Sequence, residues 1–236
     1  MTRSTAPHRA HRGHNGPGLS RYRNITQHIA LLTPAEAATF MALAQKSDYI
    51  TYRSAVCEQT LADMLRIDVS TVRRHIAHMV KARLVRRHTV TKPFHRKNLY
   101  QLATAHYCRI DVERLLSLEL PLRHKGFAAQ LKTLCLNATN LCMLSATEIA
   151  QRLGMARRTA ESYLRDLLQM GLLRRAERGY ELTRTDIFDP GQLSDDERLR
   201  LFHPEAGRYA TQAIRQGTQL NYTLAQPQPA PGTYIL

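Results

Sequence analysis

The sequence predicts a mainly α-helical fold with small β wings, because one apolar pattern occurs twice along the 236 residues. Residues 61–87 align without a gap on residues 149–175, at a spacing of 88 residues. Only six of the 27 aligned positions are identical, but the apolar positions coincide throughout, as at Leu65 and Leu153. Such a repeat indicates two copies of one structural unit, each with the same kind of core.

Each copy is predicted to contain a short helix, a tight turn and a second helix. In the first copy we expect the short helix to include Ala62 and Leu65, and the second helix to open at Thr71. A hydrophobic pair, two arginines and a hairpin-like stretch then follow, closing near Leu102 in the first copy and Leu182 in the second. The apolar residues at helical spacing in the second helices are Val72, Ile76, Met79 and Val80, and Ala160, Leu164, Leu167 and Leu168.

Residues 60–102 and 147–175 together resemble winged helix-turn-helix DNA-binding domains, of the kind found in bacterial transcriptional regulators and in plasmid or phage replication proteins. The resemblance implies two tandem winged helix-turn-helix domains plus a short C-terminal helical extension. It is specific for the fold and much less specific for the biological role. The turn of the first copy departs from the pattern, because Arg66 stands where the second copy has Gly154. Arg66 must therefore avoid a positive φ or bear strain.

Local signals divide the chain into five segments. Thr33-Pro34-Ala35-Glu36 has the form of a capping box that opens the first helix of the first copy, and Ser145 to Glu148 forms another before the second copy's short helix. Ile110–Leu120 is a candidate linking helix that ends before Pro121, and residues 127–136 are expected to form the first helix of the second copy. The segments are a disordered basic arm (1–22), a first winged-helix domain (23–104), the linking helix (105–120), a second winged-helix domain (121–183) and a C-terminal extension (184–236).

The charge of the chain favours a nucleic-acid partner. The formal net charge is +15, and attraction to phosphate is the ordinary consequence of such an excess. Residues 60–100 hold ten Lys and Arg against two acids, whereas residues 145–182 hold seven against five. The first copy and the arm therefore carry most of the charge expected to face DNA. The charge alone is also compatible with a ribosomal protein or with a soluble basic protein of another kind.

The exposed residues of the second helices and of the hairpins are the expected DNA contacts. Arg73 and Arg74 are candidates for guanine edges, and contacts to phosphate alone are the alternative. Glu161 stands where Arg73 stands in the first copy, so the two copies should not read the same bases; a partner-binding role for the second copy is the other interpretation. The predicted DNA-binding residues are Ser70, Thr71, Arg73, Arg74, His78, Arg86, Arg87, Lys92, Arg96, Lys97, Arg157, Arg158, Thr159, Ser162, Arg165, Arg174 and Arg175.

Other classes of function find little support in the sequence. No nucleotide-binding loop, nucleophile elbow or paired-acid pattern is found, so we expect no enzyme and no cofactor. The histidines at positions 8, 11 and 14 are spaced by three, but a metal site in a flexible arm is a weak expectation. The four cysteines lack a C-x-x-C spacing and are expected to be reduced thiols. No segment is long and apolar enough for a bilayer, which favours a cytoplasmic, nucleoid- or plasmid-associated protein without a membrane partner.

The leading hypothesis is a sequence-specific protein for double-stranded DNA that uses both winged helices. On the resemblance, a plasmid or phage replication initiator is favoured over a transcriptional repressor or activator of a mobile element. A protein of another class, architectural or partner-binding with weak DNA affinity, is the third hypothesis. The C-terminal extension, with helix starts expected at Ser194 and Ala206, should pack on its own domain; a homodimer or a contact with replication or transcription machinery is the alternative.

Overall fold

The computed structural model describes residues 22–92, 95–103, 105–136 and 139–190. All of them belong to one of the two units into which the chain divides, Met1–Pro190, and the second unit, Gly191–Leu236, lies outside the described residues. The expected basic arm before Tyr22, its three histidines and the helices expected from Ser194 and Ala206 also lie outside them.

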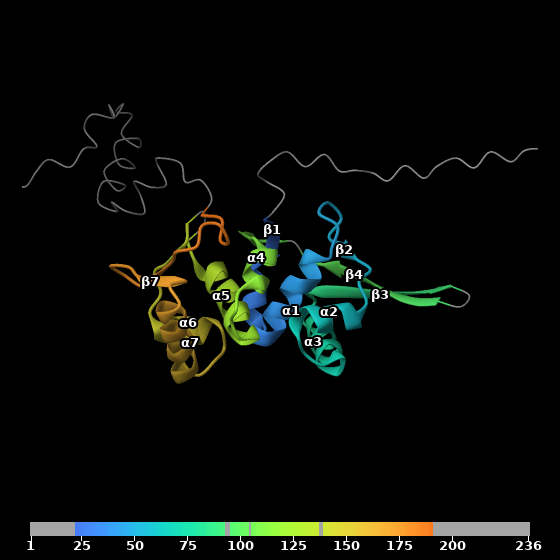
Figure 1. The fold of residues 1–236 in the computed structure, drawn as a ribbon, viewed down its shortest axis with the longest axis horizontal. Helices are drawn as coiled ribbons and strands as arrows, with labels where there is room; N and C mark the ends of the chain where they lie inside the picture. The colour runs from blue at the N-terminus through green and yellow to red at the C-terminus, as the bar shows by residue number, and fades with distance from the viewer. Residues whose placement is uncertain (1–21, 93–94, 104, 137–138, 191–236) are drawn as a thin grey trace, which may run out of the picture. The chain divides into compact units, whose positions relative to one another are not determined.

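The described residues form two runs of elements in the same order: a strand, a short helix, three longer helices interrupted by a short strand, and a hairpin (Figure 1). The first run consists of β1 (Arg23–Thr26), η1 (Gln27–Leu31), α1 (Pro34–Gln45), β2 (Arg53–Ser54), α2 (Glu58–Leu65), α3 (Val69–Lys81), β3 (Val85–Lys92) and β4 (His95–Leu102). The second consists of β5 (Tyr107–Ile110), α4 (Val112–Ser117), α5 (Leu122–Leu134), β6 (Leu141–Cys142), α6 (Ala146–Arg152), α7 (Arg157–Gln169), β7 (Leu173–Arg175) and β8 (Tyr180–Leu182). The fold is therefore mainly helical with small antiparallel sheets.

The predicted linking helix over Ile110–Leu120 is wrong in its bounds. Ile110 ends β5, which pairs with β1, and Asp111 caps α4 by accepting a hydrogen bond from the backbone N–H of Arg114 at 3.0 Å. The capping carboxylate fixes the start of the helix at Val112. The preceding residues form a strand because β1 offers them a partner, which local periodicity cannot indicate. In the second run, β5 and α4 occupy the place that β1 and η1 occupy in the first run.

Capping residues explain most helix boundaries. Both predicted capping boxes are confirmed, with reciprocal hydrogen bonds between Thr33 and Glu36 and between Ser145 and Glu148. The predicted start of α3 at Thr71 is too late, because the carboxylate of Asp68 accepts from the backbone N–H of Ser70 at 2.7 Å and the helix begins at Val69. Helix α5 likewise begins directly after Pro121, earlier than the predicted residue 127, and ends at Leu134.

Two turns have the same left-handed backbone in both runs, but glycine occupies them only in the second. Arg66 has a φ of 52° and its counterpart Gly154 a φ of 61°. Arg83 has a φ of 59° and its counterpart Gly171 a φ of 69°. A non-glycine residue in this region costs about 1–2 kcal/mol. Of the two possibilities for Arg66, the structure therefore takes the strained one.

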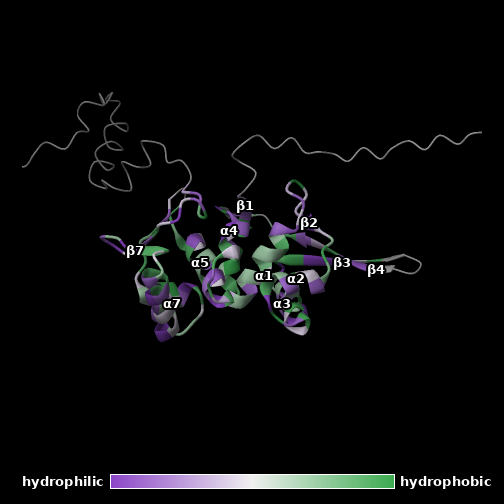
Figure 2. Cartoon of the chain, viewed as in Figure 1, coloured by the Kyte–Doolittle hydropathy of each residue, from purple (hydrophilic) through white to green (hydrophobic). Residues whose placement is uncertain are grey.

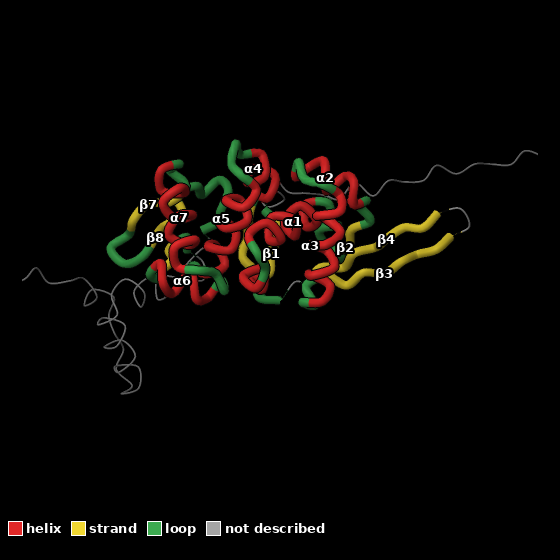
Figure 3. The backbone as a smooth tube through the Cα atoms, turned by 90° about the horizontal axis from the view of Figure 1, so that it is seen from below, coloured by secondary structure: helices red, strands yellow, loops and turns green. Residues whose placement is uncertain are grey.

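The two three-stranded sheets share one topology. In the first, β4 lies between β2 and β3, and in the second β8 lies between β6 and β7, all antiparallel. The hairpins differ in length: β3 and β4 pair over eight residues each, from Val85 opposite Leu102 to Lys92 opposite His95, whereas β7 and β8 pair over three. A long wing thus follows α3 and a short one follows α7, as Figure 3 shows in yellow.

Helices α1 and α5 pack directly against each other and are buried along most of their length. The backbones approach so closely that a Cβ atom on Gly126 would lie 1.6 Å from the carbonyl oxygen of Pro34. The side chain of Gln130 adds hydrogen bonds from its amide nitrogen to the carbonyls of Ile29 (3.0 Å) and Leu32 (2.6 Å). Figure 2 shows α1 as mostly hydrophobic or neutral, and strongly hydrophilic residues on α7. No helix among the described residues is long and apolar enough to cross a lipid bilayer.

Candidate nucleic-acid interface

Helix α3 presents a polar face outward and an apolar face to the core. Val72, Ile76 and Met79 are fully buried, and the exposed residues are Ser70, Arg73, Arg74, Ala77, His78 and Lys81. This alternation arises because the helical period places the apolar residues on one side. The helix therefore offers two adjacent arginines and small polar residues to a ligand.

Arg73 and Arg74 differ in their bonding. The Nε atom of Arg73 donates to Glu58 Oε2 at 2.9 Å, and the other carboxylate oxygen accepts from the hydroxyl of Tyr100 at 3.0 Å. This chain of bonds ties the hairpin, α2 and α3 together. Burial, together with the neighbouring Glu58 carboxylate, raises the pKa of Tyr100 to about 12, so its hydroxyl stays a donor. Arg74 is exposed and has no hydrogen bond or ion pair to any described residue, so its guanidinium is free to bind a ligand.

The two histidines of α3 have internal partners. His75 is buried, its Nδ1 lies 2.8 Å from Thr39 Oγ1, and burial lowers its pKa. His78 lies with its Nδ1 2.8 Å from Glu36 Oε1 on α1, although nearly half of its side chain is exposed. Burial of Glu36 raises the pKa of its carboxyl, but hydrogen bonds from Thr33 and His78 outweigh it and the pKa is lowered. His78 therefore holds α3 to α1, in addition to whatever contact its exposed edge makes.

The N-terminus of α3 is already occupied by a carboxylate of the protein. Asp68 already fills the helix N-terminus with a carboxylate, and hydrogen bonds from the Ser70 hydroxyl and N–H lower its pKa. A phosphate near the same N–H groups meets a negative charge that the sequence reasoning did not take into account. The Ser70 hydroxyl and the helix terminus are therefore already engaged by Asp68, and the Thr71 hydroxyl is the one that stays open to a contact.

The long hairpin carries basic side chains on both of its faces. Tyr100 points to the core, and Arg87 lies opposite it on the same face of the sheet, whereas Arg86 and His88 lie on the other face. Lys97 is exposed farther along the hairpin, on the same face as Arg86. The side chains of Lys92 and Arg96 lie outside what the structure describes.

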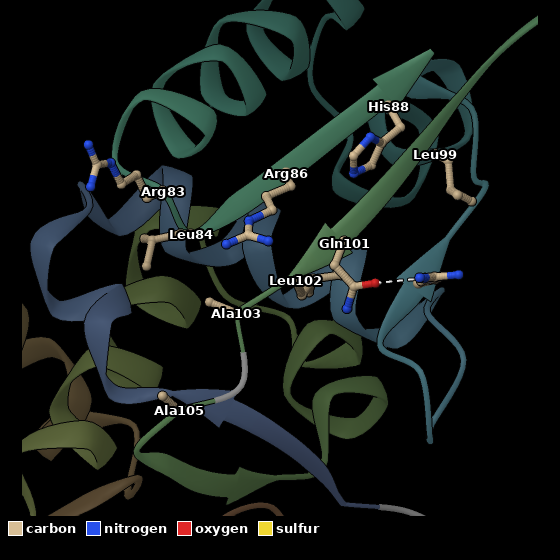
Figure 4. Close-up of a pocket in the computed structure, with 10 residues that line it drawn as sticks. Arg83, Leu84, Arg86, His88, Leu99, Gln101, Leu102, Ala103 and Ala105 are labelled. Atoms are coloured by element: carbon tan, nitrogen blue, oxygen red, sulfur yellow. Dashed lines mark hydrogen bonds between the residues drawn. The ribbon is translucent and has the colours of Figure 1, made fainter. Parts of the chain in front are cut away.

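The outer face of this sheet contains a basic hollow that the sequence reasoning missed (Figure 4). Its volume is about 720 Å³, and the residues around it include Arg53, Arg83, Arg86 and His88 but no carboxylate. Arg53 lies on β2 and donates from Nε to Gln101 at 2.8 Å. Arg53 and Arg83 were not predicted because β2 is two residues long and Arg83 is in a turn. Their common location depends on pairing between strands that are distant in sequence.

Helix α7 repeats the arrangement with different chemistry. Arg157, Arg158, Thr159, Ser162 and Arg165 are exposed as predicted, and Ala160, Leu164 and Leu167 are buried. Arg157 donates from Nε to Glu161 at 2.7 Å, so one of its two leading arginines is again tied to a carboxylate. In the short wing, Arg174 pairs with Glu181 at 2.7 Å and the Arg175 guanidinium lies 5.8 Å from the centre of the Tyr180 ring. Arg158 and Arg165 have no such partner among the described residues.

One pair of contacts occurs in both runs with its chemistry exchanged. Glu36 on α1 bonds His78 on α3, and 88 residues later His124 on α5 bonds Asp166 on α7; both distances are 2.8 Å. The acid and the histidine have changed places. Each pair joins an opening helix to the helix that carries the exposed arginines, and therefore helps to fix the orientation of α3 and α7.

Comparison with known protein families finds a match in the second run. Neither a curated protein nor a solved structure matches the chain. Residues 134–177, which contain α6, α7 and β7, match the IclR helix-turn-helix domain. That domain is a winged helix-turn-helix of DNA-binding transcription regulators. The match falls on the less basic copy and includes the predicted contacts from Arg157 to Arg175. The chain thus carries an IclR-type DNA-binding helix-turn-helix at residues 134–177.

Proposed function

We propose that the protein is a sequence-specific regulator of transcription that binds double-stranded DNA through two winged helices, one in each run of elements. The observation that carries the proposal is the IclR-type match over α6 and α7 together with the same order of elements in the first run. Helices α3 and α7 are both thirteen residues long and lie 88 residues apart. A regulator is favoured over a replication initiator, because the matched domain is one of transcription regulators.

In this proposal α3 and α7 enter the major groove and the hairpins contact the backbone. Arg74 and Arg158, which lie in the first two turns of their helices and have guanidiniums without internal partners, bond base edges. Arg73 and Arg157 reach DNA only by sharing or leaving their carboxylates. The remaining contacts are phosphate contacts from hydroxyls, from one further basic residue on each helix and from the wings, namely Ser70, Thr71, His78, Arg86, Arg87, Lys92, Arg96, Lys97, Thr159, Ser162, Arg165, Arg174 and Arg175.

Selection of bound sequences from a random duplex pool, at low and at physiological salt, tests the proposal. We expect a defined motif that is lost in Arg74→Ala and in Arg158→Ala. The control is Arg114→Ala on α4, which removes the same charge from a half-exposed residue that forms ion pairs with Asp111 and Asp186. Binding that is steeply salt-dependent but has no sequence preference would replace the proposal with the architectural one.

A further inference from the structure

The two runs contact each other through the same elements. Helix α1 packs against α5, its counterpart, and β1 pairs antiparallel with β5, which holds the corresponding place in the second run. An interface in which a surface meets its own counterpart is isologous, and an isologous interface implies a two-fold axis. A head-to-tail arrangement would instead bring different elements together.

A second pair of contacts between the runs is reciprocal. The short helix η1 of the first run contacts α5 of the second, and the short helix α4 of the second run contacts α1 of the first. The residues 88 positions after η1 are 115–119, which overlap α4. Such an exchange, in which i contacts j and j contacts i, is the signature of a two-fold axis.

One position contacts its own counterpart. Gly126 lies 88 residues after Ala38, and a Cβ atom added to Gly126 would lie 3.2 Å from the backbone nitrogen of Ala38. Residues that meet their own symmetry mates lie beside a two-fold axis. The axis therefore passes between α1 and α5 at the level of these two residues.

We propose that the two runs are related by an approximate two-fold axis and that, as a consequence, a single chain recognises two unlike half-sites in inverted orientation. This inference rests on the proposed function for its DNA ligand. In Figure 1, α3 and α7 both lie along the lower edge of the molecule, at the two ends of the α1 and α5 pair, as a shared duplex requires. The half-sites are unlike because Glu161 and Ser162 replace Arg73 and Arg74.

The first experiment rearranges the selected motif. Its two halves are synthesised in inverted and in direct orientation over a series of spacings, and the wild-type affinity is measured with the number of chains per duplex. We expect one chain to bind the inverted arrangement at least ~10-fold more tightly, because the direct one leaves one helix on mismatched base pairs. Tighter or equal binding of the direct arrangement overturns the inference, as does an inverted site that holds two chains. If the selected motif has its halves in direct orientation, the inverted arrangement is refuted and the proposed function is left intact. If the selection yields no motif, both the inverted arrangement and the proposed function are refuted.

The second experiment gives α7 the outward residues of the first turns of α3 and keeps Asp166, the counterpart of His78, because it pairs with His124. The variant combines Arg158→Ser, Glu161→Arg, Ser162→Arg and Arg165→Ala; Thr159 already matches Thr71. All four positions face solvent or are partly exposed, so the core is unchanged and thermal unfolding checks the fold. We expect this variant to prefer a perfect inverted repeat of the α3 half-site over the wild-type motif. A preference for a direct repeat of that half-site would contradict the two-fold relation.

Discussion

Replacing Arg74 by alanine is expected to weaken binding to the preferred DNA site more than replacing Arg73. Both side chains extend from the exposed face of α3, but Arg73 already donates to Glu58 at 2.9 Å. A bidentate contact from arginine to guanine contributes about 1–3 kcal/mol of discrimination. Loss of Arg74 should therefore lower the affinity by roughly 5- to 150-fold.

The contribution of Arg73 to the free energy of DNA binding is reduced, because Arg73 must share or break its bond to Glu58. The side chain of Arg73 is 64% exposed, and exposed ion pairs contribute about 0–1 kcal/mol. The loss in Arg73→Ala should accordingly be smaller than in Arg74→Ala, by up to ~5-fold. Glu58→Gln removes the competing charge and keeps an oxygen for the Tyr100 hydroxyl. In that background we expect Arg73→Ala to cost as much as Arg74→Ala.

A double-mutant cycle measured by fluorescence anisotropy on the selected duplex, at several salt concentrations, provides the test. Replacing a residue that contacts only phosphate lowers the affinity for all sequences and reduces the slope of affinity against salt concentration by about one. Replacing a residue that contacts a base also lowers the discrimination between base pairs at one position of the site. If Arg73→Ala costs more than Arg74→Ala in the wild type, or if Glu58→Gln leaves the Arg73 effect unchanged, the bonding of these arginines does not govern their role.

Further predictions concern stability and are measured by urea unfolding. Gly126→Ala places a methyl group on the Pro34 carbonyl and should lower the free energy of unfolding by at least ~1–3 kcal/mol; little change would mean that α1 and α5 are not in close contact. Arg83→Gly should raise it by about 1 kcal/mol, because the left-handed backbone at φ 59° no longer strains a side chain, and a loss would contradict this. Burial lowers the pKa of His75, so the unfolded chain binds a proton on this residue more tightly than the folded chain does. The contribution of neutral His75 to the free energy of unfolding is therefore fully present above pH 6.5 and is lost as the pH falls further. This loss of stability at low pH should be smaller in His75→Gln.

Local chemistry predicted the repeated part of the fold well. The buried face of α3 and both capping boxes follow from residues within one or two helical turns. The β1 and β5 strands were missed because each is only four residues long and forms through its pairing with the other. Gly126 did carry a signal, since a glycine inside a helix costs about 1 kcal/mol relative to alanine and indicates a close approach.

The candidate site was predicted less completely, because the bonding of an exposed arginine depends on residues far along the chain. Arg73 is paired with Glu58, which lies on another helix, and nothing in the sequence of α3 indicates that Arg74 is free and Arg73 is not. Arg53 and Arg83 join the basic hollow only through the order of strands in the sheet. Residue type and exposure could be predicted; the partner of each side chain could not.

The exchanged histidine and acid pairs show why comparison of single positions underestimates the repeat. Glu36 aligns with His124 and His78 aligns with Asp166, so both columns look unrelated. The contact is nevertheless kept at 2.8 Å in each run, because either residue can hold either end of the bond. The pattern that remains constant is therefore the link between each opening helix and its outward-facing helix. Since α1 and α5 also pack on each other, these two links connect α3 and α7 through one continuous set of contacts, which helps to fix the positions of the two helices relative to each other.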